Sequence, residues 1–132
     1  MLDDILQASV NIRLEKAREC LKAAENSILF TSYATAANRL YYAIFHSIRA
    51  VLLTIGYSSR KHSGIIAEFR QRYIKTEVFP PEFSDIINNA FNMRNNSDYE
   101  DFFIVSKEDV IKQIENAKTF LASVEAYINT LR

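Results

Sequence analysis

Arg94 is the residue whose position most clearly indicates chemistry. It lies seven residues after Ile87 and four after Ala90, where a helical pattern calls for another apolar side chain, so its guanidinium should point toward the interior or a groove at its edge. A cation there needs partners. Asp98 is spaced for an intrahelical ion pair, and the hydroxyl of Tyr99 could join it. This group either ties the end of a helix to the next loop or forms a functional site.

A second set of polar residues follows the spacing of one helical stripe. Arg39, Tyr42, His46 and Arg49 are separated by three, four and three residues, which aligns them beside a buried face. Two cations, a phenol and an imidazole in line could bind a phosphate or a base. They could equally form a polar subunit interface or a solvated face with extended side chains.

A short basic turn is the third candidate. Lys61 and His62 stand at the expected start of a helix, and a helix N-terminus with nearby cations attracts anions. Because short basic turns are common on protein surfaces, this signal is weaker than the other two.

The sequence lacks the residues that several common kinds of functional site require. The two glycines, Gly56 and Gly64, build neither a phosphate loop nor a dinucleotide motif. The two histidines and Cys20 do not have the spacing of zinc ligands, so we expect no metal and no cofactor. A nucleophilic pair of Cys20 with a histidine is an alternative, but a lone helical cysteine is more typical of core packing.

The composition indicates one helical domain, residues 1–132. Of these 132 residues, 48% are hydrophobic and 24% charged, with only two glycines and two prolines, which argues against turn-rich β folds. The net charge is zero, so contact with nucleic acid would have to be local. A single cysteine, no signal-like N-terminus and no long apolar run predict a cytoplasmic protein without a membrane contact.

Apolar stripes define the helices that must position the candidate residues. The first is expected over residues 3–29, with Arg13 and Lys16 on the opposite face, and the second from Ser32, as N-cap, to Gly56. A short third helix follows and ends before Pro80. The stripes of these helices are Val10, Leu14, Ala17, Leu21, Ala24 and Ile28; Ala36, Leu40, Ile44, Ile48, Val51 and Ile55; and Ile65, Ile66, Phe69 and Tyr73.

The fourth helix begins near Pro81 and should weaken at residues 95–98, whose short polar side chains compete for backbone hydrogen bonds. A loop over residues 99–105 leads to the last helix, which Ser106 and Asp109 begin with a capping-box pattern. Short connections make neighbours antiparallel, which predicts an all-α, up-and-down four-helix bundle with an additional short helix. The two stripes are Phe83, Ile87, Ala90 and Phe91; and Val110, Ile114, Ala117, Leu121, Val124, Ile128 and Leu131.

Three motifs together resemble the HEPN domain family. They are the run ANRLYYAIFH at residues 37–46, KHSG at residues 61–64 and RNNSDY at residues 94–99. The resemblance covers almost the whole chain and is nearest to stand-alone prokaryotic HEPN proteins. It implies a five-helix domain of toxin–antitoxin systems that works with a minimal nucleotidyltransferase.

Many HEPN domains are metal-independent ribonucleases that use an arginine and, after four to six intervening residues, a histidine, brought together at a homodimer cleft. Arg94 matches the arginine, whereas Tyr99 stands where the histidine would be. An unperturbed imidazole titrates near pH 6.5 and a phenol near pH 10, so Tyr99 is not an equivalent proton carrier. His46 or His62 would have to supply that group.

The resemblance therefore leaves two functions open. The first is an RNA-binding and RNA-cleaving component, and the second is a non-catalytic module that binds a nucleotide or docks onto the transferase. It also suggests Tyr99 as an acceptor of nucleotides from that transferase. The expected catalytic residues are Arg94, Tyr99 and His46, and the expected RNA- or nucleotide-binding residues are Arg39, Tyr42, Arg49, Lys61, His62 and Asp98.

Overall fold

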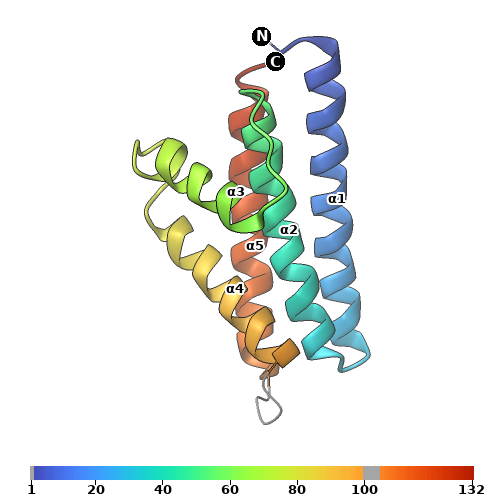
Figure 1. The fold of residues 1–132 in the computed structure, drawn as a ribbon. Helices are drawn as coiled ribbons and strands as arrows, with labels where there is room; N and C mark the ends of the chain where they lie inside the picture. Colours follow the sequence, from blue (N-terminus) through green and yellow to red (C-terminus); the bar gives the residue numbers. More distant parts are fainter. Residues whose placement is uncertain (1, 100–104) are drawn as a thin grey trace.

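The computed structural model describes residues 2–99 and 105–132, and the elements in these ranges are all helical. Figure 1 shows α1, α2 and α5 side by side, with α4 slanting beside them and α3 crossing the bundle. This arrangement confirms the predicted all-α bundle with an additional short helix. The elements are α1 (Asp4–Leu29), α2 (Tyr33–Leu53), α3 (His62–Phe69), the π-helical turn η1 (Arg70–Ile74), α4 (Glu82–Tyr99) and α5 (Lys107–Asn129).

A side-chain N-cap stabilises the first turn of α1, the first helix, and of α5, the last. The Asp3 carboxylate accepts a hydrogen bond from the amide of Leu6 at 2.8 Å, and the Ser106 hydroxyl accepts one from the amide of Asp109 at 3.1 Å. Each bond satisfies an amide that has no partner within its helix. Ser32 occupies the predicted N-cap position of α2, but its hydroxyl donates to the Thr35 hydroxyl instead of capping a backbone amide.

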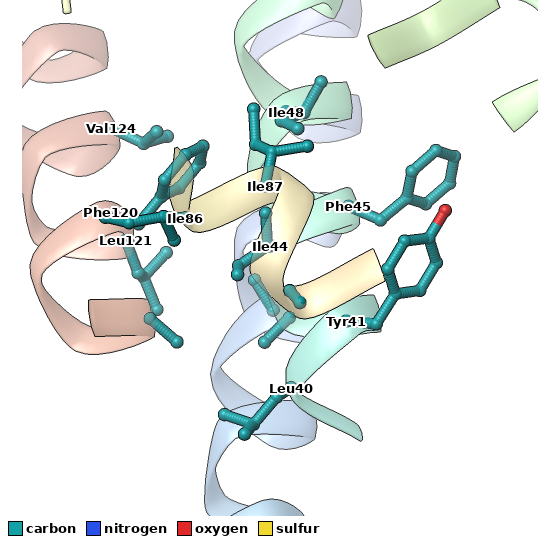
Figure 2. Packing of buried hydrophobic residues seen from close by; sticks show 14 of the residues in the cluster. Leu40, Tyr41, Ile44, Phe45, Ile48, Ile86, Ile87, Phe120, Leu121 and Val124 are labelled. Atoms are coloured by element: carbon teal, nitrogen blue, oxygen red, sulfur yellow. The ribbon is translucent and has the colours of Figure 1, made fainter. Parts of the chain in front are cut away.

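Helix α2 is the centre of the bundle. Twelve of its 21 residues are buried, and it contacts α1, α3, α4 and α5. Its stripe from Ala36 to Val51 packs as predicted, with Ile48 fully enclosed, whereas Ile55, the last predicted member, is exposed because α2 ends at Leu53. In Figure 2, Tyr41 and Phe45 point away from Phe120 and Val124 of the core. The same helix therefore supplies both the core and a second, aromatic face.

The structure differs from the sequence predictions near the third and fourth helices. The third helix widens into the π-helical turn η1 and ends at Ile74, well before Pro80. Residues 95–98 do not interrupt α4, whose backbone stays helical to Tyr99; the rest of the predicted loop up to residue 104 lies outside the described residues. Phe91 was expected to face the core but is 43% exposed, because its neighbour Ala90 takes the inward position.

The two ends of the chain meet at one end of the bundle (Figure 1). The Arg132 guanidinium donates to the side-chain oxygens of Gln7 at 2.9 Å and Asn11 at 2.7 Å, which ties the C-terminus to α1. None of the helices in the described ranges is long and apolar enough to cross a membrane.

Candidate functional site

Three arginines lie over aromatic rings of α2. The Arg94 guanidinium carbon is 4.7 Å from the ring centroid of Tyr41 and 5.2 Å from that of Tyr42. The corresponding carbon of Arg39 lies 5.3 Å from the Tyr42 centroid, and that of Arg49 lies 5.8 Å from the Phe45 centroid. Each such contact is worth about 0.5–1 kcal/mol at a partly exposed site. We call this surface the α2 cation–aromatic face; it consists of Arg39, Tyr41, Tyr42, Phe45, His46, Arg49, His62 and Arg94.

His62 enters this face from the first residue of α3. Its imidazole stacks on the Phe45 ring with the centroids 3.9 Å apart, and its Nδ1 lies 3.3 Å from the Tyr41 hydroxyl. Burial lowers the pKa of His62, and the positive charges of Arg94 and Arg49 lower it further. Arg94 and His62 thus contact the same tyrosine, and the imidazole is neutral at pH 7.

His46 lies at the edge of this face that is next to α1. Its Nδ1 lies 3.4 Å from the guanidinium of Arg13, and the ring is half-buried. Burial lowers the pKa of His46 to about 4, and the surrounding positive charges contribute to this shift. These charges belong to Arg13, Lys16, Arg49 and Arg39. At neutral pH this imidazole is uncharged and can accept a proton or a hydrogen bond.

The face concentrates positive charge in a chain whose net charge is zero. Within the described residues, the ion pairs involve Arg18, Arg72 and Lys118, and none joins a carboxylate to Arg13, Arg39 or Arg49. Burial raises the pKa of Tyr41 although Arg94 opposes the shift, so the phenol stays neutral. The face can therefore donate hydrogen bonds to an anion and offer rings to a planar group.

The predicted site residues are brought together in part. Arg94 is half-buried against α2, which confirms its expected position at the edge of the interior. Lys61 stands at the exposed N-cap position of α3, next to the face but outside its ring contacts. Asp98 and Tyr99 continue the α4 backbone, and their side chains lie outside the described residues, so the expected ion pair of Arg94 with Asp98 stays a prediction.

Two members of this region were not recognised in the sequence. The sequence pattern places Arg13 on the face opposite the apolar stripe of the first helix, yet it is half-buried and contacts His46. It stands three residues after Val10 and four before Ala17, so it borders the buried stripe, and that spacing was the available signal. Tyr41 is nearly buried, but its hydroxyl reaches His62 from another helix, a contact that no local pattern reveals.

Cys20 belongs to the core rather than to this face. It is buried on α1, and burial raises the pKa of its thiol. Its sulfur is 4.0 Å from a nitrogen of Arg39. A thiol with a raised pKa is a poor nucleophile at neutral pH, which supports the packing interpretation.

Comparison with known proteins adds an independent finding. The family model described as "HEPN domain" matches residues 10–127. The protein named Putative toxin MJ0142 of Methanocaldococcus jannaschii is 33% identical over 115 residues, which cover 87% of this chain and 78% of the relative. The UPF0332 protein of Thermotoga maritima is 35% identical over 117 residues, 89% of each chain. A second M. jannaschii protein, Putative toxin MJ0605, is 35% identical over 101 residues, which cover 75% of this chain and 74% of the relative.

Proposed function

Because the chain belongs to the HEPN domain family, we propose that it is the toxin-like component of a toxin–antitoxin system and binds single-stranded RNA through the α2 cation–aromatic face. Two of its relatives are named as toxins. The observation that carries RNA binding is the placement of Arg39, Arg49 and Arg94 over the rings of α2. The second component of the system would be a minimal nucleotidyltransferase.

This arrangement suits unpaired RNA, which presents phosphate oxygens and exposed bases. A guanidinium that lies over a ring keeps its N–H groups at the edge, where they can donate to phosphate oxygens. Exposed ring surface beside it, as on Phe91, can stack on a base. With three arginine contacts to a single strand, the logarithm of the binding constant should fall with the logarithm of salt concentration with a slope of about −2.

Fluorescence anisotropy with a labelled single-stranded RNA tests this function. Arg94→Gln should weaken binding about tenfold, since losing about 1.4 kcal/mol changes a dissociation constant by that factor. Arg18→Gln is the matched control, because Arg18 is also a partly exposed helix arginine but pairs with Glu15 and Glu125. Equal affinities of the wild type and both variants would refute the assignment of the face.

RNA cleavage without a metal is the second candidate function, and the shared contact of Arg94 and His62 with Tyr41 favours it. The neutral His62 would take the proton of an RNA 2′-hydroxyl as its oxygen attacks the adjacent phosphorus. Arg94 would stabilise the charge on the phosphorane. The bond to the 5′-oxygen then breaks, and that oxygen takes a proton from water, leaving a 2′,3′-cyclic phosphate and a 5′-hydroxyl end.

Cleavage should be measured in the presence of EDTA, with detection of the cyclic phosphate. His62→Asn should abolish the reaction, while His46→Asn, on the α1 side, should retain most of it. The reverse result would assign proton transfer to His46, as the sequence suggested. RNA binding without any cyclic phosphate would favour the non-catalytic module.

A homodimer is part of this proposal. The face lies on one side of a small bundle, and Phe91 beside it is exposed next to Tyr41. An isologous contact there would place two copies of the face in one cleft. Sedimentation at tens of micromolar, where ordinary dimers persist, should show a dimer, and a strict monomer would refute it.

The partner transferase would act on Tyr99. Adding a nucleotide to this phenol would place negative charge near the end of α4, close in sequence to Arg94, and would weaken phosphate binding. Co-expression with a nucleotidyltransferase encoded in the adjacent reading frame should increase the intact mass of the wild type but not of Tyr99→Phe. An unchanged wild-type mass with an active transferase would exclude Tyr99 as acceptor.

A further inference from the structure

We propose that a pocket between α1 and the C-terminal end of α2 binds a phosphate group. The pocket is open to solvent and has a volume of about 220 Å³. It lies outside the contact between Arg94 and Tyr41. We call it the α1–α2 pocket; its lining residues are Ser9, Ile12, Arg13, Arg49, Leu53 and Ser58.

The polar groups of the pocket suit an anion. Arg13 and Arg49 supply two guanidiniums, and Ser9 and Ser58 supply two hydroxyls. Guanidinium forks match the oxygens of a phosphate and can bind it through paired hydrogen bonds. Within the described residues, neither arginine pairs with a carboxylate. The two charged side chains of the lining are therefore both positive, and the charge of Arg49 acts on Arg13.

The two arginines also act unfavourably on each other. Burial lowers the pKa of Arg13, and the positive charge of Arg49 lowers it further. On its other side Arg13 meets the neutral His46, which supplies no negative charge. An anion between the two guanidiniums would replace this repulsion by attraction, so phosphate binding should be favoured most where both arginines are present.

The apolar part of the lining indicates that the phosphate is attached to a larger molecule. Ile12 and Leu53 provide apolar surface that can contact the uncharged part of a ligand but gives a free ion no favourable contact. Arg39 and Arg49 are ten residues apart on one helix, or about 15 Å at the rise of an α-helix. A strand that reaches from Arg39 to this pocket would place different phosphates at the two ends. For RNA as the source of the phosphate, this inference rests on the proposed function.

Side-chain NMR tests the pocket without RNA. In 15N-labelled protein, inorganic phosphate should shift the Nε–H signals of Arg13 and Arg49 at matched ionic strength against chloride. Arg18, paired with Glu15 and Glu125, is the internal control and should not move. Arg49→Gln should remove the shift of Arg13. Signals that stay in place, or that shift equally for Arg18, would overturn the proposal.

Two ligands then distinguish the sources of the phosphate. With single-stranded RNA, Arg13→Gln and Arg49→Gln should each weaken binding and reduce its salt slope by at most about 0.7, the value for one lost phosphate contact to a single strand. With 5′-AMP, the same arginine signals should shift at lower concentrations than with inorganic phosphate if the pocket takes a free nucleotide.

The outcomes separate the two proposals. Loss of RNA affinity in Arg94→Gln without any phosphate-induced shift would overturn the pocket and keep the proposed function. A phosphate-induced shift in a protein that binds no RNA would keep the pocket and overturn the proposed function; tighter binding of 5′-AMP than of phosphate would then assign the pocket to a nucleotide.

Discussion

Two aromatic clusters in this molecule use the same side chains for different purposes. The first, which we call the packing cluster, joins α3, η1, α4 and α5, and its rings pack against one another; those of Phe83 and Phe120 are 4.6 Å apart. The second is the α2 cation–aromatic face, whose rings contact guanidiniums and imidazoles. The packing cluster consists of Phe69, Tyr73, Phe79, Phe83, Phe120 and Tyr127.

Both clusters contain contacts between rings, so these contacts do not distinguish them. The other side chains around the rings do. Phe69 and Phe120 are fully enclosed, so both ring faces contribute to burial. Tyr42 is only half-buried and lies under Arg39 and Arg94. An aromatic cluster whose rings lie under guanidiniums is therefore a stronger indication of a binding site than an aromatic cluster alone.

The largest expected effect belongs to the packing cluster. Phe120→Ala should lower the free energy of unfolding by about 3–5 kcal/mol, through lost burial and the cavity it leaves. Urea denaturation measures this loss. Tyr42→Ala, in the other cluster, should cost clearly less because its ring is half-buried; similar losses for both would contradict the comparison.

Acid should act mainly on the α2 face. In the folded chain the pKa of His46 is about 4, compared with an ordinary value of about 6.5 in the unfolded chain. The unfolded chain therefore binds more protons between these values, and stability should fall as the pH is lowered from about 6.5 to about 4. His46→Gln should make this decline shallower in urea melts. An identical decline in the variant would show that other groups control it.

A smaller effect on stability is expected from removing the hydrogen bond between the Tyr41 hydroxyl on α2 and His62 on α3. Tyr41→Phe keeps the ring beneath Arg94 but removes the hydroxyl near His62. The cost should be about 0.5–1.5 kcal/mol in the free energy of unfolding, the usual net value of one hydrogen bond. Because the ring stays, RNA affinity should change little; a large loss of affinity would give the hydroxyl a direct role.

The smallest effect on stability is predicted for Arg39→Gln. Losing one partly exposed cation–ring contact should change the free energy of unfolding by under about 1 kcal/mol. The same substitution should reduce the salt slope of RNA binding by about 0.7. A large loss of stability would make Arg39 a packing residue and would blur the distinction between the clusters.

Much of the fold was predictable because helix stripes and caps are local. The stripe of α5 from Val110 to Ile128 and its Ser106 cap could be identified without knowledge of the tertiary structure. The π-helical turn at Arg70–Ile74 could not, since nothing in its spacing distinguishes it from an α-helix. Phe91 was misplaced because the spacing from Ile87 and Ala90 does not show which of two adjacent apolar positions turns away from the core; the structure buries Ala90 and exposes Phe91.

The candidate site was predictable only along single helices. The spacing of Arg39, Tyr42 and Arg49 placed them on one stripe of α2, which the structure confirms. Contacts between helices depend on packing angles that the sequence does not reveal locally. This is why the approach of His62 to Tyr41, and of Arg13 to His46, required the structure.

The short connection between α1 and α2 has a consequence for the order of folding. Three residues join two long helices with an extensive mutual interface, so their contacts are close in sequence and should form early. We expect the transition state to contain this hairpin, with α5 docking later. Ala36→Gly on α2 should then slow folding more than Ala117→Gly on α5, which should mainly speed unfolding. Arg13, His46 and Arg49 all belong to the hairpin, so they would meet before the rest of the domain encloses its core.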